Sequence, residues 1–333
     1  MIITRTPMRM SFFGGGTDFA EFYKEYGGAV ISSTFDKYCY VTVRHLPRFF
    51  DYVSELCYSK IERVQNASEI RHPLIREAMR WLDMREIRLS YEADLPARTG
   101  LGTSSSFAVG MLNAFHSMKG QFVSKRKLAD EAIYLERTLC KEAGGIQDQI
   151  ATACGGLNKI VFTSQGYEVN PIIIRPDRKK ELNMHLMLFF TGFSRNSYEI
   201  QENTRMELKR KTKDLLEMKQ MVDEAESILV DRTRSLDEFG KLLDEGWKLK
   251  RSINNVISTD NIDLMYCMAK KAGALGGKLL GAGGGGFMLF YVRKEQQQAV
   301  KQELKKFLQV PFEFEERGTD VIYYNPEVFI LED

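Results

Sequence analysis

The sequence has few of the residues that build disulfide frameworks or transition-metal sites. Its five cysteines are scattered and odd in number, and no two of them form a CxxC pair. This usage favours reduced thiols in the cytoplasm. Only four histidines are present and none is spaced from another as a ligand pair, so we expect any metal to be a hard cation held by oxygen atoms.

Long apolar runs and an excess of one charge are also missing. The net charge of the 333 residues is +2, which gives no electrostatic reason to expect nucleic acid or a membrane surface as a partner. No apolar run approaches the ~20 residues of a membrane helix, and the first residues lack the apolar core of a signal peptide. We therefore expect a globular cytoplasmic protein of one large domain or two ordinary ones.

The stretch LPARTGLGTSSS, residues 95–106, gathers glycines and hydroxyl side chains in front of an apolar helical pattern. Gly100 and Gly102 allow the backbone to bend sharply and to approach a ligand closely. The helix that follows would present unpaired N–H groups and the positive end of its dipole, which suit a phosphate. A serine-capped helix after a flexible loop is the alternative that this stretch alone leaves open.

The remaining chain alternates predicted strands and helices in two parts. Prolines and polar residues over 164–180 predict a boundary, which divides the chain into domains 1–170 and 171–333. Helices are predicted over 123–143 and over the charged stretch 198–230. Alternating or β-rich runs predict strands over 2–13, 38–46, 87–95, 157–162, 184–192 and 287–292.

Two common nucleotide-binding motifs are absent. The nearest approach to a P-loop, ALGGKLL, has Ala272 at the first glycine position and Leu279 in place of the hydroxyl residue. The run GAGGGG, residues 281–286, matches GxGxxG, but it precedes a predicted strand, whereas a dinucleotide-binding turn opens a helix. Three separated glycine-rich segments remain: FFGGGTD, LPARTGLGTSSS and KLLGAGGGGF.

These segments resemble the three motifs of the GHMP small-molecule kinases. PARTGLGTSSS fits P-x-x-x-G-L-G-S-S-A-A with Thr103 in the first serine position, and TPMRMSFFGGGTDF is most like the sugar-kinase form of the first motif. The resemblance implies an α+β fold with an S5-like N-terminal domain, a ferredoxin-like C-terminal domain, and ATP and substrate in the cleft. The residues it assigns to ATP are Pro96, Arg98, Gly100, Leu101, Gly102, Thr103, Ser104, Ser105 and Ser106.

The resemblance also assigns the residues of phosphoryl transfer. Ser104 and Glu136 match ligands of Mg²⁺, and Asp148 matches the base that accepts the proton of the attacking hydroxyl. Arg9 occupies the basic position of the first motif, where it would hold Asp148 ionised. Without the resemblance, Glu136 would be taken for an exposed helix carboxylate and Arg9 for a surface arginine on a strand.

Substrate contacts are expected from the first and third motifs. Where galactokinase-like members carry Glu-His, this chain has Gly15-Gly16, and FFGGGTDF looks most like the members that phosphorylate D-glycero-D-manno-heptose 7-phosphate at its anomeric hydroxyl. Asp18 matches a carboxylate that binds sugar hydroxyls; by itself it would be a helix N-cap. Arg195 is a candidate for the far phosphate, with a surface salt bridge as the alternative. The expected substrate residues are Gly15, Gly16, Thr17, Asp18, Gly283, Gly284 and Arg195.

Two other functions stay open. One is another sugar 1-kinase of the family, of the L-fucose or galactose type, and the other is a catalytically inactive sugar sensor. The joint presence of Ser104, Glu136, Asp148 and Arg9 argues against the sensor. The sequence does not determine the stereochemistry of the sugar, the adenine contacts, or whether the chain forms a homodimer.

Overall fold

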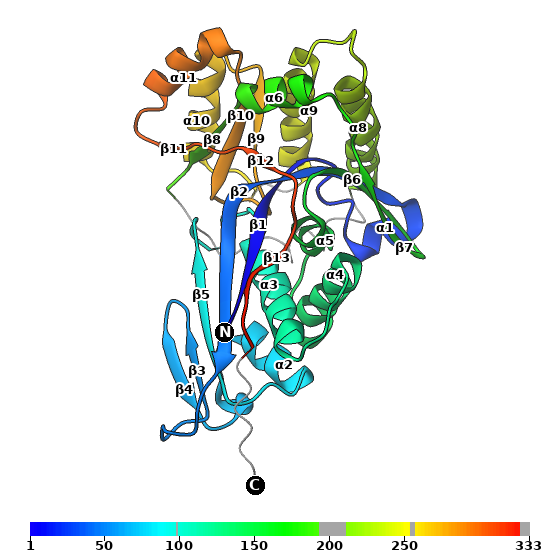
Figure 1. Cartoon of the computed structure of the whole chain (residues 1–333). Coiled ribbons are helices and arrows are strands. Elements are labelled where there is room, and N and C mark those ends of the chain that lie inside the picture. Colours follow the sequence, from blue (N-terminus) through cyan, green and yellow to red (C-terminus); the bar gives the residue numbers. More distant parts are fainter. Residues whose placement is uncertain (98, 193–210, 254–256, 327–333) are drawn as a thin grey trace.

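The computed structural model describes residues 1–97, 99–192, 211–253 and 257–326. Within these ranges the chain forms a nine-stranded sheet and a four-stranded sheet, which lie one above the other in Figure 1 with helices packed against each. The α+β organisation expected from the sequence is therefore confirmed. No helix in these ranges combines the length and the hydrophobicity that a membrane span requires.

The larger sheet is built around two long antiparallel strands, β1 (Ile2–Phe13) and β2 (Gly28–His45). Their β-branched and aromatic residues suit a pleated, largely buried surface. The other strands of this sheet are β3 (Ser54–Cys57), β4 (Ile61–Val64), β5 (Ile87–Ala93), β6 (Leu157–Thr163), β7 (Gly166–Pro171), β12 (Phe314–Glu315) and β13 (Asp320–Tyr324). The main order is β13-β1-β2-β5-β3-β4, while β6 and β12 also pair with β2, and β7 pairs with β6.

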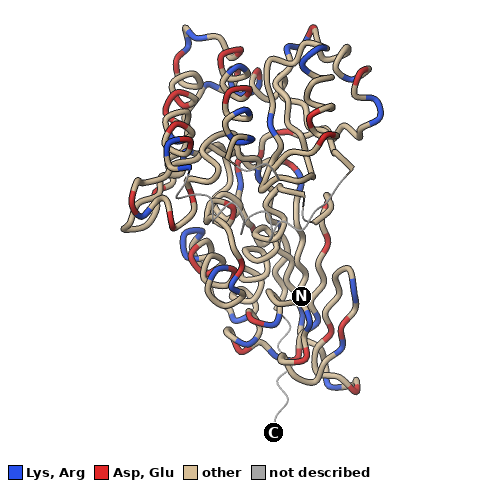
Figure 2. The backbone as a smooth tube through the Cα atoms, turned by 180° about the vertical axis from the view of Figure 1, so that it is seen from behind, with Lys and Arg blue, Asp and Glu red and all other residues tan. Residues whose placement is uncertain are grey.

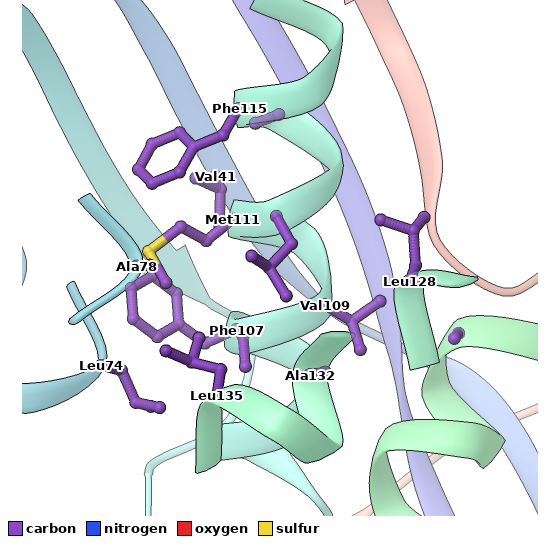
Figure 3. Close-up of a cluster of buried hydrophobic side chains, with 14 of the residues drawn as sticks. Val41, Leu74, Ala78, Phe107, Val109, Met111, Phe115, Leu128, Ala132 and Leu135 are labelled. Atoms are coloured by element: carbon purple, nitrogen blue, oxygen red, sulfur yellow. The ribbon is translucent and has the colours of Figure 1, made fainter. Parts of the chain in front are cut away.

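Several helices of this half pack around one buried helix, α3 (Thr103–Met118). Figure 3 shows Phe107 and Met111 of α3 gathered with Val41 of β2 on one side, and Val109 facing Leu128 on the other. Because apolar residues surround its axis, α3 is buried on nearly all sides. The other helical elements of this half are α1 (Ala20–Tyr26), η1 (Ala67–Glu69), α2 (Pro73–Trp81), α4 (Lys125–Ile133), the π-helical turn η2 (Tyr134–Leu139) and α5 (Gln147–Cys154). Of these, α4, η2 and α5 pack directly on α3, whereas α1 packs on β6.

The smaller sheet is fully antiparallel and agrees with the ferredoxin-like half that the resemblance implies. Its strands are β8 (Leu186–Phe190), β9 (Gly276–Leu279), β10 (Phe287–Tyr291) and β11 (Leu308–Val310), in the order β11-β8-β10-β9. Its helical elements are α6 (Pro176–His185), α8 (Thr212–Val230), α9 (Asp237–Ile253), α10 (Asp260–Lys271), η3 (Lys294–Gln296) and α11 (Gln297–Glu303). Figure 2 shows both signs of charge interspersed along the peripheral helices of the two halves.

After the smaller sheet, the chain returns to the larger one. β13 pairs antiparallel with β1, where Ile2 lies opposite Tyr324, and β12 pairs with β2. Figure 1 shows the red end of the chain running beside the blue strand β1. The division into domains 1–170 and 171–333 stays a prediction, and the sheet of the first part includes strands from the second.

Aromatic side chains connect the two halves. Phe239 of α9 meets Phe12 and Phe13 of β1 edge to face, with ring centroids 5.5 and 5.1 Å apart. All three rings are buried in one hydrophobic cluster that contains residues of both sheets. This contact holds α9 against the end of β1 that leads into the first glycine motif.

We expect Phe239→Ala to lower the free energy of unfolding by about 3–5 kcal/mol, because it leaves a cavity between β1 and α9. Urea denaturation followed by tryptophan fluorescence measures this change. The matched control is Phe122→Ala, since the Phe122 side chain is 95% exposed and its removal should change stability by no more than ~0.5 kcal/mol. Equal losses in the two variants would contradict the role of this contact.

Candidate active site

The Arg9 guanidinium group joins three segments that are far apart in the sequence. Its Nε and Nη2 donate to the two carboxylate oxygens of Asp148, at 2.8 and 2.6 Å, and its Nη1 donates to the Gly100 carbonyl oxygen at 2.7 Å. The Arg9 side chain is 4% exposed and that of Asp148 24% exposed. A bidentate pair of this kind fixes the orientation of the carboxylate. Asp148 is therefore held in the first turn of α5 and stays reachable from solvent.

The second glycine motif leads into α3, as the sequence predicts. The helix begins at Thr103, one residue before Ser104. Gly102 has the left-handed conformation, with φ 71°, and offers no side-chain cap to the helix, so the N–H groups of the first turn can serve an anion. Ser106 is used by the fold, since its hydroxyl donates to the Pro7 carbonyl at 2.9 Å. Ser104 is exposed, whereas Thr103 and Ser105 are buried.

Two hydrogen bonds fix the loop before α3, one within the loop and one from β1. The Thr99 hydroxyl donates to the Pro96 carbonyl at 2.8 Å, and the Arg9 N–H donates to the Leu101 carbonyl at 3.0 Å. Arg98, which was expected to bind ATP, lies outside the described residues, as does Arg195.

The third glycine motif packs against the second so closely that their backbones are in contact. A Cβ atom on Gly281 would lie 2.2 Å from Gly100 Cα, and one on Gly286 would lie 2.2 Å from the Thr99 carbonyl oxygen. Both positions need glycine because a side chain would separate the two loops. Gly283 and Gly284, expected near the substrate, contact Ile257: the Gly284 N–H donates to its carbonyl at 2.9 Å. Their role toward a substrate stays a prediction.

Asp18 faces the N-terminus of α5 and does not cap α1. Its Oδ1 accepts from the Gly16 N–H at 3.0 Å and its Oδ2 from the Gln147 N–H at 3.2 Å. The side chain is buried, and burial, followed by the charge of Asp148, raises the pKa of Asp18. A Cβ atom on Gly145 would lie 1.8 Å from Asp18 Oδ2, so only glycine fits beside this carboxylate.

In the turn between β1 and Asp18, Thr17 is hydrogen-bonded within the fold, whereas Gly15 lies next to unfilled space. The Thr17 hydroxyl lies 2.8 Å from the Gly14 carbonyl and 2.9 Å from the Ala29 carbonyl, which share its one proton, and it accepts from the Ala29 N–H at 3.1 Å. It is fully buried, so it serves the turn. Gly15 borders space: the nearest atoms to a Cβ there are Gln147 Nε2 at 3.8 Å and Ser11 Oγ at 4.0 Å. Within the described chain, Ser11 Oγ and Gln147 Oε1 are buried without a hydrogen-bond partner.

Glu136 lies in η2, where the helix predicted over 123–143 widens into a π-helical turn and ends at Leu139. Its Oε2 accepts from the Ser105 hydroxyl at 3.2 Å and from the Gln149 amide, while Oε1 is buried with no partner in the described chain. Burial raises the pKa of Glu136 to about 7. A buried carboxylate oxygen without a donor suits a hard cation such as Mg²⁺. The hydroxyl that touches Glu136 is that of Ser105, the neighbour of the expected ligand Ser104.

Two lysines that sequence reasoning did not assign lie close to the same site. Lys250 Nζ of α9 donates to the carbonyls of Gly281 and Leu279, at 2.5 and 3.3 Å, and Lys278 Nζ of β9 donates to the Phe12 carbonyl at 2.8 Å. Burial, followed by the charge of Arg9, lowers the pKa of Lys250 to about 8. Burial also lowers the pKa of Lys278 far below its ordinary value. In the sequence, Lys250 is one of several charged residues of a helix, and Lys278 occurs in the failed P-loop match and as the first residue of the third glycine-rich segment.

Comparison with known proteins identifies a kinase family and kinases that this chain resembles. Residues 63–156 match the model of the GHMP kinases N terminal domain, and residues 221–310 match that of the GHMP kinases C terminal domain. A D-glycero-alpha-D-manno-heptose 7-phosphate kinase of Campylobacter jejuni is 28% identical over 296 residues, which cover 85% of this chain and 86% of that protein. An L-fucokinase/L-fucose-1-P guanylyltransferase of Bacteroides fragilis is 30% identical over 210 residues, 59% of this chain and 21% of that protein.

A solved structure shares the whole architecture. The D-glycero-D-manno-heptose 1-phosphate kinase from Bacteroides thetaiotaomicron superposes with a TM-score of 0.80 at 24% identity, covering 97% of this chain and 99% of that one. At this identity the likeness concerns the fold. Together the two domain models cover the glycine loop before α3, the helices α3 to α5, part of α8, and α9 to α11. The chain belongs to the GHMP kinase family.

Proposed function

We propose that this GHMP kinase is an ATP-dependent sugar kinase that phosphorylates the anomeric hydroxyl of D-glycero-D-manno-heptose 7-phosphate. The observation that carries the kinase assignment is the bidentate pair between Arg9 and Asp148, placed between the glycine loop of α3 and the buried carboxylate of Asp18. Phosphoryl transfer asks a protein chiefly for positioning and charge stabilisation, and this arrangement supplies both.

In the proposed reaction, Asp148 accepts the proton of the anomeric hydroxyl as its oxygen bonds to the γ-phosphorus of ATP. The bond between that phosphorus and the bridging oxygen breaks, and ADP leaves. Arg9 orients the carboxylate through its two hydrogen bonds. The N–H groups at the start of α3 and the glycine loop cradle the phosphates of ATP.

Magnesium fits the carboxylate of Glu136, because Oε1 of that side chain is buried without a partner among the described residues. In these residues no group of three acidic, histidine or cysteine side chains is clustered to hold a metal by itself. We therefore assign Glu136 and the serine hydroxyls at 104 and 105 as its protein ligands, with phosphate and water completing the shell as is usual for Mg²⁺. When bound, the cation would neutralise phosphate charge.

The choice of a heptose phosphate as substrate is supported by the first motif and by the Campylobacter jejuni relative, whose name states that activity. Gly15 leaves space where galactokinase-like members carry a side chain. The side chains of Ser11 and Gln147 flank this space, and each has a buried oxygen without a partner in the described chain. Buried polar atoms without partners are typical of positions that a ligand satisfies. The similarity to an L-fucokinase region keeps a fucose-type substrate as the second candidate.

We expect Asp148→Asn to lower kcat by ~10²-fold or more, because the amide cannot accept the proton of the hydroxyl. The affinity for ATP, measured by equilibrium binding, should stay near that of the wild type. Asp260→Asn is the matched control, since Asp260 is an exposed acid in the first turn of another helix, α10. Near-wild-type turnover of Asp148→Asn would remove this residue from the mechanism.

We expect Glu136→Gln to make the stability of the metal-free protein less dependent on pH. In the wild type, the folded state keeps the Glu136 proton up to about pH 7, while the unfolded state loses it near the ordinary pKa of 4.5. The wild type therefore loses stability as pH rises through this window, on the order of 2 kcal/mol, and the variant does not. Denaturation in EDTA at pH 5 and pH 8 measures the difference between the two proteins.

The control for Glu136→Gln is Glu217→Gln, an exposed position on α8. It should follow the wild type at both pH values. In activity assays, Glu136→Gln should also need a higher Mg²⁺ concentration for half-maximal rate. An unchanged magnesium titration would show that the carboxylate is structural only.

The wild-type enzyme should prefer heptose 7-phosphate to the same heptose without phosphate by ~10²-fold or more in kcat/KM. Removing a well-bound phosphate leaves its charged partners unsatisfied, which costs transition-state binding. Steady-state kinetics with the two sugars measures the ratio. A ratio near one, or turnover of L-fucose at a higher kcat/KM, would replace the substrate assignment and leave the kinase assignment standing.

A further inference from the structure

Lys250 and Lys278 border a small pocket between the two halves of the molecule. The pocket is lined by Phe12, Phe13, Gly14, Gly246 and the two lysines, among other residues. Its Phe12–Gly14 wall is the chain segment that leads directly into Gly15 and Asp18. Lys278 is 6% exposed, and its Nζ reaches across from the smaller sheet to the Phe12 carbonyl. The lysines thus lie beside the proposed sugar site and on the opposite domain.

Neither lysine has a counter-ion in the described part of the chain. Their hydrogen bonds go to main-chain carbonyls only, and no described carboxylate lies within ion-pair distance of either Nζ. An ammonium group that is removed from water without an anion is costly. The cost is larger for Lys278, which is buried, than for Lys250, which is partly exposed. The Arg9–Asp148 pair is neutral as a whole and supplies no free anion to either lysine, which leaves Asp18 as the remaining acid among the charges that act on Lys250.

The balance of charge at the pocket favours an anionic ligand. The charges that act on Lys250 are those of Arg9 on β1, Asp18 after β1 and Asp148 on α5, and those that act on Lys278 are Lys250 and Arg9. Asp148 is already paired with Arg9. The pKa of Asp18 is raised, so the ionised form of this carboxyl group is disfavoured. A phosphate dianion would restore the balance and stabilise both ammonium groups.

We propose that Lys250 and Lys278 bind the phosphate that the acceptor sugar already carries, at the end remote from the hydroxyl that is phosphorylated. This inference rests on the proposed function and names residues of the described chain for a role that was assigned to Arg195. The pocket adjoins the turn of Gly15, whereas the phosphates of ATP are expected at the start of α3. The γ-phosphate of ATP is the other source of the same chemistry, because Lys250 also bonds Gly281, which packs on Gly100.

The test compares Lys250→Met and Lys278→Met with the wild type on two acceptors, heptose 7-phosphate and unphosphorylated heptose. Methionine keeps the length of the side chain and removes its charge. We expect kcat/KM for the phosphorylated sugar to fall between about tenfold and a hundredfold in each variant. The value for the free sugar and the KM for ATP should change less than about threefold. Lys250→Arg should recover part of the loss, since it restores the charge.

The matched control is Lys219→Met, because Lys219 Nζ also donates to a main-chain carbonyl, that of Tyr26 at 2.7 Å. It should leave both acceptors unchanged. Equal losses on the two acceptors together with a raised KM for ATP would overturn the proposal and assign the lysines to the γ-phosphate. Equal losses with a lowered melting temperature would overturn it in favour of a structural role.

A binding measurement separates this proposal from the choice of sugar. With a non-hydrolysable ATP analogue bound, inorganic phosphate should raise the melting temperature of the wild type and of Lys219→Met, and should not raise that of Lys250→Met or Lys278→Met. This result would support the phosphate site even if heptose 7-phosphate proves not to be turned over, in which case only the proposed substrate fails. An equal phosphate effect in all four proteins, or none in the wild type, would overturn the site.

Discussion

Arg9 donates to both carboxylate oxygens of Asp148 and to the Gly100 carbonyl. These bonds fix the positions of β1, α5 and the loop before α3 relative to one another. These segments are brought together by sheet pairing and helix packing that involve much of the larger half. The guanidinium group is almost fully enclosed, so each of its partners is needed to satisfy a buried charge. A shift of α5 or of the glycine loop would therefore change the position of the Asp148 carboxylate, to which we assign proton transfer.

The titratable groups around this pair are all displaced in the direction that favours their neutral forms. Burial raises the pKa of Asp18 and of Glu136, and it lowers the pKa of Lys250 and of Lys278. Burial is the largest cause of each shift, because removal from water disfavours the charged form of acids and bases alike, and neighbouring charges add to it. Phosphate, cation and sugar hydroxyls are the groups that would return these side chains to their charged states. Ligand binding should accordingly stabilise the folded protein.

Much of the architecture could be predicted because the patterns are local. The strands at 2–13 and 287–291 and the helix after Gly102 follow from apolar and β-branched runs with clear ends. The strand predicted over 38–46 is only the second part of β2, which begins at Gly28. Its first part is buried on both faces and shows no alternation, so periodicity could not reveal it.

Other features depend on contacts that no local pattern encodes. The strands β12 and β13 are short and pair with partners about three hundred residues away. The π-helical turn that carries Glu136 continues the same apolar pattern as α4, so the sequence did not distinguish it from an α-helix. The resemblance to GHMP motifs indicated Arg9, Glu136 and Asp148, but not which hydroxyl touches Glu136. Lys250 belongs to no glycine motif, and Lys278 is the first residue of the third glycine-rich segment, where the motif match assigned it no role. Their positions near the site become visible only from the tertiary contacts of α9 and β9.

The return of the chain to the first sheet also bears on biosynthesis. β1 is made about three hundred residues before 320–324, yet its hydrogen bonds along one edge wait for those residues. Closing so large a loop costs entropy that grows slowly with its length, and it delays pairing more than it weakens the final sheet. During translation, β1 therefore presents an open edge, the kind of surface at which chains join one another and chaperones act. The last strand to be made is the one that removes this hazard.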